Sequence, residues 1–335
     1  MRSADVATQL LPQQCLYSVL CEDGAGAELR VIGAVRDVIV APQQPERVVA
    51  AIADPAIRII TLTITEKGYC LSADGLSLDV DNDSIRSDLQ DPQAPRSAIG
   101  LLALGLRQRM ETGAGAITVL SCDNLSQNSH RLRELLRQYF ALTWPQVQQW
   151  LEENVRFPCS MVDRIVPAMT AQGRSRQAQL LGLADAAAVA TEPFSQWVIE
   201  DDFAAGRPAW ESAGAQFTTD IVPFENMKLR LLNAAHPSVP KTLVFRGLLE
   251  HLTALDWNPL TIKRDPGPLP FWEGPYQKIP PTIGTDKNTA LHLVAVAQCP
   301  RHRHRQASDR YEYRKKESTS YAGLRRDEPK NGAQK

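Results

Sequence analysis

The fold class follows from the run Ile57-Arg-Ile-Ile-Thr-Leu-Thr-Ile-Thr65, which is rich in β-branched residues. Such a run is typical of a strand buried on both faces, as the strands of parallel sheets are. A short helix is expected before it, over 45–53, and Thr65-Glu66-Lys67-Gly68-Tyr69 ends the strand. Open parallel sheets place their ligand-facing loops at that end. A plain polar turn would fit the same residues.

Further elements follow this strand in a regular order. We expect a helix over 96–111, a strand over 116–120 and a helix over 129–142, with Ser121-Cys-Asp-Asn124 as the cap of that last helix. Alternating strands and helices predict parallel strands with right-handed crossovers. The other expected segments are strands over 16–21 and 29–40 and a loop over 76–95. The sequence therefore predicts an α/β fold.

Composition limits the class of protein. With 335 residues, 43% hydrophobic and 22% charged, the chain can bury one large or two ordinary cores. Six cysteines without CxxC pairs, and an N-terminus without a secretory signal pattern, predict a reduced, cytoplasmic setting. No apolar run reaches about 18 residues, so no membrane span is expected. The formal charge is −1, but residues 237–335 hold 17 Lys and Arg against 10 Asp and Glu.

Chemistry is expected in Glu225-Asn-Met-Lys228-Leu-Arg-Leu-Leu-Asn233-Ala-Ala-His236. On one helix, at ~100° per residue, Asn233 and His236 lie about 140° and about 80° from Lys228, so all three can face one cleft. Burial lowers the pKa of a lysine, which suits a general base, while amide and imidazole groups can donate to a substrate oxygen. An ordinary amphipathic helix with a solvated lysine has the same spacing.

Several motifs then follow one another along the chain. They are Thr65-Glu-Lys-Gly-Tyr69, Ser121-Cys-Asp-Asn124, Phe157-Pro-Cys-Ser-Met-Val-Asp-Arg-Ile-Val-Pro167, Gln196-Trp-Val-Ile-Glu200 and the spacing of Lys228, Asn233 and His236. In this order they resemble the long-chain mannitol dehydrogenase family, which includes mannitol 2-dehydrogenases and fructuronate reductases (mannonate oxidoreductases). The resemblance covers about residues 15–236.

The resemblance implies a metal-independent oxidoreductase that uses NAD or NADP and acts on a sugar alcohol or sugar acid of the mannitol or mannonate type. The implied catalytic roles fall on Lys228 as general base, Asn124 and Asn233 around the substrate oxygen, His236 on the substrate, and Glu225 and Asp163 in the proton path and its network. The implied cofactor contacts fall on Thr65, Glu66, Tyr69, Ser121 and Asn124. The implied fold is a Rossmann-type domain followed by a largely helical substrate domain.

Two departures from the family pattern shape the expected domains. Nothing before Leu16 resembles the family's glycine-rich first unit, which binds the cofactor diphosphate. After His236, residues 237–335 hold 11 of the 23 prolines and four of the six histidines, which disfavours long helices. We therefore expect an incomplete Rossmann-like domain over 1–195, the start of the helical domain over 196–236, and a tail of unassigned role, produced by a shifted frame or rearrangement, over 237–335.

Other functions remain open from the sequence. A truncated chain could be a noncatalytic remnant of such an enzyme. Arg301-His-Arg-His-Arg305 and Arg314-Lys-Lys316 could contact nucleic acid, although a solvated terminus explains them better and no nucleic-acid partner is expected. Cys299, His302 and His304 lack the fourth protein ligand that a closed zinc site needs, so no metal is expected. The sugar, the choice between NAD and NADP, and the oligomeric state are not readable from the sequence.

Overall fold

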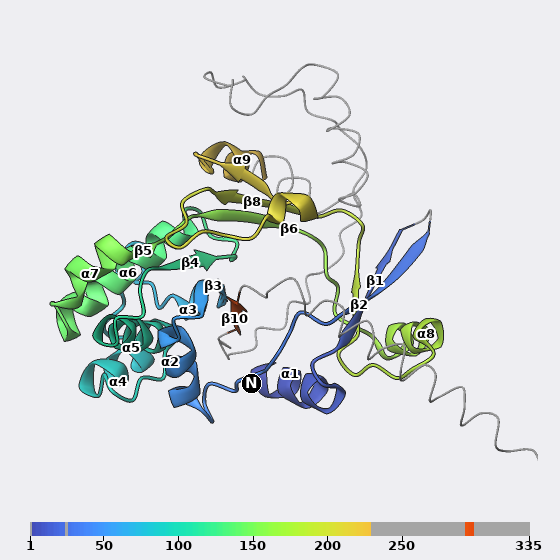
Figure 1. Ribbon diagram of the computed structural model, residues 1–335, viewed down its shortest axis with the longest axis horizontal. Helices are drawn as coiled ribbons and strands as arrows, with labels where there is room; N and C mark the ends of the chain where they lie inside the picture. Colours follow the sequence, from blue (N-terminus) through green and yellow to red (C-terminus); the bar gives the residue numbers. More distant parts are fainter. Residues whose placement is uncertain (1, 24–25, 229–291, 298–335) are drawn as a thin grey trace, which may run out of the picture. The chain divides into compact units, whose positions relative to one another are not determined.

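The computed structural model describes residues 2–23, 26–228 and 292–297, which all belong to one compact unit, Met1–Ala297. Figure 1 shows the helices and strands, coloured from blue to red along the sequence. No helix in this described part is long and apolar enough to cross a membrane. Two of the expected site residues, Asn233 and His236, lie outside the described residues, as does nearly all of the expected tail.

The central sheet has the order β10-β3-β4-β5. Strands β3 (Ile57–Thr63), β4 (Ile117–Ser121) and β5 (Val155–Arg156) are parallel, while β10 (His292–Ala297) pairs with β3 in the antiparallel direction. All five residues of β4 are buried, as expected for a strand covered on both faces. Since Leu62 lies opposite Ser121, β3 and β4 end at the same edge, where the loops that follow them meet. The parallel α/β arrangement predicted from the sequence is confirmed.

The helices beside this sheet are α2 (Pro45–Ala53), α5 (Ala98–Glu111), α6 (Asn128–Thr143) and α7 (Val147–Asn154). Helix α2 packs against α5, and α5 packs against α6 and α7 (Figure 1). A glycine is needed at position 105 because a Cβ there would lie 2.6 Å from the Ile52 side chain. Helix α5 begins after Ser97, whose hydroxyl accepts the Gly100 amide at 2.9 Å. These helices carry much of the main apolar core.

Three local predictions were wrong. The loop expected over 76–95 contains α4 (Asp83–Gln90), which is capped when Asn82 accepts the Ser84 amide at 3.0 Å. The alternating strand expected over 29–40 is only β2 (Ala27–Ile32). Residues 121–124 do not cap α6, which begins after Gln127, a residue at φ +50°. In the first and third cases polar residues, Asn82 and Gln127, stand at the start of the observed helix.

Two further sheets complete the described strands. In one, β1 (Tyr17–Glu22) lies between β2 and β7 (Val189–Thr191), and in the other, β8 (Gln196–Glu200) lies between β6 (Ser160–Asp163) and β9 (Gln216–Thr218). Strand β6 brings the motif residues Val162 and Asp163 to the site described below. The remaining helices are α1 (Arg2–Leu10), η1 (Leu11–Gln13), α3 (Thr65–Gly68), α8 (Ala171–Leu181), η2 (Trp210–Ala213) and α9 (Val222–Met227).

Candidate active site

Lys228 is placed by α9, which ends one residue before it. Its side chain is buried, with 9% of the residue exposed. The ammonium nitrogen Nζ donates to Asn124 Oδ1 and to the backbone carbonyl of Val162. A buried amine needs such acceptors, because an unpaired one would lose hydration without compensation. The loop after β4 and strand β6 therefore hold Lys228 in one position.

A cleft of ≈ 510 Å³ lies beside this amine. Its lining combines polar groups with two tryptophans whose rings stack at a centroid distance of 5.0 Å. The lining residues are Asn124, Val162, Asp163, Arg164, Ser195, Gln196, Trp197, Trp210, Ala213, Gly214, Ala215 and Lys228. Ligand sites commonly join an apolar or aromatic wall to a few oriented polar groups. The cleft therefore has the make-up of a site for a small ligand with polar groups.

The carboxylate of Asp123 fixes the loop after β3. It accepts the backbone amides of Ile64 and Thr65, each at 3.0 Å, and the Tyr69 hydroxyl at 2.9 Å. Thr65 is held at φ +60°, a left-handed conformation that is unfavourable for a β-branched residue. The Asp123 hydrogen bonds therefore couple this strained residue to the loop that carries Asn124.

The expected cofactor contacts divide into two groups. Thr65 and Glu66 are exposed after β3, so a ligand could reach them. Tyr69 and Ser121 are fully buried and hydrogen-bonded to each other. Burial, followed by the nearby Asp123 carboxylate, raises the pKa of Tyr69, so its phenol keeps the proton that it donates. Tyr69 and Ser121 therefore stabilise the ends of β3 and β4 from within the protein interior.

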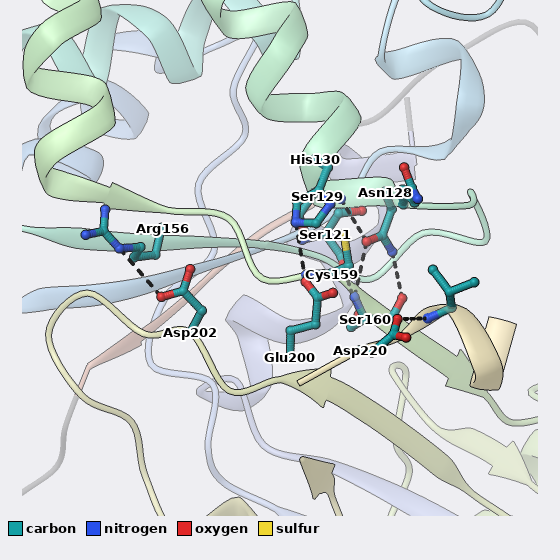
Figure 2. A network of polar contacts seen from close by, with 12 residues as sticks. Ser121, Asn128, Ser129, His130, Arg156, Cys159, Ser160, Glu200, Asp202 and Asp220 are labelled. Carbon is teal, nitrogen blue, oxygen red and sulfur yellow. Dashed lines mark hydrogen bonds and ion pairs between the residues drawn. The ribbon is translucent and has the colours of Figure 1, made fainter. Parts of the chain in front are cut away.

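Buried amide and hydroxyl groups connect the end of β4 to β6. The Asn128 side chain donates to the carbonyls of Asp123 at 3.0 Å and Ser160 at 2.8 Å, and accepts the Ser160 amide at 3.2 Å. The Ser160 hydroxyl donates to the Ser121 carbonyl at 2.7 Å. Figure 2 shows Asn128 and Ser160 facing each other in this network. These hydrogen bonds fix the loop after β4 and strand β6 relative to each other, and these two segments carry the acceptors of Lys228.

Glu225 connects α9 to the loop after Asn124. Its two carboxylate oxygens accept the Ser126 hydroxyl and the Gln127 amide, each at 2.9 Å, and only 8% of the residue is exposed. Asp163 lines the cleft. The structure thus brings together four expected residues, Lys228, Asn124, Asp163 and Glu225.

Sequence reasoning gave no role to Asp123 and Asn128. Asp123 stands inside the motif that ends at Asn124, so its acidic side chain was a readable signal. Its partners lie 54 to 59 residues earlier in the chain. Only the pairing of β3 with β4 shows that these groups meet.

Comparisons with known proteins find similarity over most of the chain. Residues 2–212 match the family model described as the mannitol dehydrogenase Rossmann domain. The D-mannonate oxidoreductase of Escherichia coli (strain K12) is 42% identical over 299 residues, which cover 88% of this chain and 61% of that protein. The polyol:NADP oxidoreductase of Gluconobacter oxydans (strain 621H) is 41% identical over 74% of this chain and 50% of its own.

A solved structure extends the comparison to the fold. The ternary complex of Pseudomonas fluorescens mannitol 2-dehydrogenase with NAD and D-mannitol has a TM-score of 0.67 and 38% identity, over 70% of this chain and 48% of that one. The chain spans about half to three fifths of the length of these relatives. A match covering 88% of the chain also includes residues beyond His236, and the family model begins at residue 2, so the similarity is longer than the expected residues 15–236. The fold is Rossmann-like, as the motifs predicted, and the chain belongs to the mannitol dehydrogenase family.

Proposed function

We propose that this chain interconverts a sugar alcohol or sugar acid and its keto sugar, with NAD or NADP as the hydride acceptor or donor. The observation that carries the proposal is the buried Lys228 amine, held by Asn124 and the Val162 carbonyl on the wall of the cleft. The names of the relatives, D-mannonate oxidoreductase, polyol:NADP oxidoreductase and mannitol 2-dehydrogenase, support substrates of the mannitol or mannonate type.

In this proposal Lys228 is the general base. Asn124 Oδ1 and the Val162 carbonyl accept hydrogen bonds from its Nζ and so orient the amine on the wall of the cleft. A neutral Lys228 takes the proton from the reacting hydroxyl, and Asn124, which touches the same amine, orients the substrate oxygen. In the reverse direction, Lys228 returns the proton to the oxygen of the keto sugar.

The described residues also fit a nicotinamide nucleotide. The cofactor would supply hydride transfer when bound, and nucleotides bind beyond the carboxyl ends of parallel strands. That edge carries the exposed Thr65 and Glu66, and the Asp123 hydrogen bonds fix the backbone beside them. We assign Thr65 and Glu66 to cofactor contact, Asn124 to both cofactor and substrate, and Tyr69 and Ser121 to support of this edge.

The remaining assignments rest on the family resemblance. Asn233 would hold the substrate oxygen and His236 the substrate. Glu225 and Asp163 would belong to the proton path and its surrounding network. The described cysteines are free thiols, and we propose the cytoplasm as the compartment. The substrate is the only partner that we propose.

Turnover tests this function directly. Purified full-length chain is mixed with NADH or NADPH and with fructuronate, tagaturonate or fructose, and cofactor oxidation is followed by absorbance. Activity with one of these keto sugars, abolished in Lys228→Met, is the expected result. A folded sample that oxidises neither cofactor with any of them would refute the enzyme and favour a noncatalytic member of the family.

A further inference from the structure

A group of metal-ligand side chains lies outside the cleft. His130 lies on α6, Cys159 lies between β5 and β6, and Glu200 ends β8. One ligand atom from each residue lies within 4.8 Å of the other two. Figure 2 shows the His130 ring and the Glu200 carboxylate turned toward each other beside Cys159. None of the three lines the cleft that contains Lys228, and the proposed reaction gives them no role.

The spacing of the nitrogen and oxygen fits a tetrahedral ion. His130 Nε2 and Glu200 Oε2 are 3.4 Å apart. Zinc bonds of about 2.0–2.2 Å to nitrogen and oxygen at tetrahedral angles place two such ligands roughly 3.3–3.4 Å apart. The same carboxylate oxygen accepts the Cys159 amide at 2.7 Å, which holds it beside the cysteine. One edge of the coordination shell is therefore already formed.

The sulfur is the third ligand. Cys159 is fully buried, and burial raises the pKa of its thiol to about 12, with the Glu200 carboxylate acting in the same direction. The backbone amides of His130 and Ser129 act in the opposite direction, because they donate to the sulfur. Without an ion Cys159 is a neutral thiol at physiological pH. A divalent cation would supply the positive charge that makes the thiolate favourable.

We propose that His130, Cys159 and Glu200 bind one zinc-like divalent cation, with a solvent molecule as the fourth ligand. Zinc prefers these nitrogen, sulfur and oxygen donors in a tetrahedral arrangement. The His130 side chain is 51% exposed, so an ion can reach the buried sulfur when the imidazole turns outward. On binding, Cys159 releases its proton to solvent and the sulfur forms the bond to the metal. No electron transfer is involved.

The ion would link α6, the segment directly before β6 and the end of β8. Cys159 directly precedes Ser160, whose amide and carbonyl are bound by Asn128 at the start of α6. Two residues later, Val162 accepts from Lys228. An ion at Cys159 therefore holds α6, β6 and β8 together without entering the cleft. Its expected effect is on the stability of this region.

Metal titration of the reduced, chelator-stripped full-length chain tests the site. Zn²⁺ is titrated in competition with a chromophoric chelator, and Co²⁺ is added separately because a thiolate–cobalt bond absorbs in the near ultraviolet. We expect one ion per chain at this site, with the cobalt band present. Cys159→Ser and His130→Asn should each weaken binding by about tenfold or more, and Cys159→Ser should abolish the band. Cys70→Ser removes another buried thiol and should change neither.

Two results would overturn the proposal. One is the absence of a zinc-binding event that depends on His130 and Cys159. The other is a cobalt band that survives in Cys159→Ser, which would place the ion elsewhere, for example on Cys299, His302 and His304. Glu200→Gln should also weaken zinc binding, because glutamine can still accept the Cys159 amide but is a poorer metal ligand. Unchanged zinc binding in this variant would overturn the assignment of Glu200 as a ligand. The test measures no turnover, so its outcome is independent of the proposed enzyme.

Discussion

The carboxylate of Asp123 accepts the hydroxyl of Tyr69 at 2.9 Å. The same carboxylate binds the amides of Ile64 and Thr65, so one buried side chain joins the ends of β3 and β4. Asn124, which holds Lys228, is the next residue. The position of Asn124 therefore depends on how Asp123 is held.

Asp123→Asn is expected to lower turnover. Asparagine keeps one acceptor oxygen but replaces the other with an amide donor, which would face a backbone N–H or the Tyr69 hydroxyl. The loop after β3 would lose a hydrogen bond, and Asn124 would no longer be fixed against Lys228. We expect kcat to fall by about tenfold or more, because misplacement of reacting groups by about 1 Å is costly. Steady-state kinetics at saturating cofactor and substrate measures the change.

Asp88→Asn is the matched control. The Asp88 carboxylate is also buried and accepts two amides and one hydroxyl, from Arg96 at 2.7 Å and from Ser97 at 3.0 Å and 2.5 Å. Both substitutions should lower the free energy of unfolding by about 1–3 kcal/mol. Only Asp123→Asn should lower kcat at a temperature where both variants are folded. An equal fall in kcat for the two would show that Asp123 acts only through stability.

The substitution Lys228→Arg separates the proposed base from a structural cation. Arginine keeps the positive charge and can donate to Asn124 and Val162, but it does not lose its proton at neutral pH. If Lys228 takes the proton of the substrate, both Lys228→Arg and Lys228→Met should lower kcat by about 10²–10⁴-fold. Stopped-flow measurement of the first turnover isolates this step. Near-normal turnover in Lys228→Arg would mean that only the charge is required.

The sequence predicted the parallel sheet because its signals are local. Residue type alone predicts a buried strand in the β-branched run over 57–65 and in the apolar run over 116–120. The site was predicted in part for the same reason, since Lys228 and Asn124 belong to motifs. Asp123 was not given a role because its partners become visible only once β3 and β4 are paired. Helix α4 was missed because its single fully buried apolar residue, Ile85, stands among polar neighbours.

Arg109 is expected to be a large contributor to stability. The residue is 1% exposed, and its side chain donates to five carbonyls, those of Ile52, Asp54, Ala114, Gly115 and Ala116. Methionine has a similar length but no donor, so Arg109→Met would leave buried carbonyls unpaired. We expect a loss of about 3 kcal/mol or more in the free energy of unfolding, measured by urea denaturation.

An exposed arginine provides the comparison for Arg109. Arg133 forms an ion pair with Glu152, and both side chains are at least one third exposed. Surface pairs of this kind contribute about 1 kcal/mol or less. Arg133→Met should therefore leave the urea midpoint almost unchanged. Equal shifts for the two variants would contradict the role assigned to the Arg109 hydrogen bonds.

The buried Cys159 thiol predicts how stability changes at alkaline pH. Burial raises its pKa from 9.0 to about 12, so the unfolded chain releases a proton that the folded chain keeps. This contribution to stability is complete below pH 9 and is lost as the pH rises toward about 12, at about 1.4 kcal/mol per pH unit. In chelator, the free energy of unfolding should therefore fall less steeply for Cys159→Ser than for the wild type between about pH 9 and 11. Cys70, whose pKa burial raises to about 11, should give the same difference over a narrower range. If the free energy of unfolding falls with pH at the same rate in the wild type and in Cys159→Ser, the folded chain does not retain the Cys159 thiol proton over this pH range.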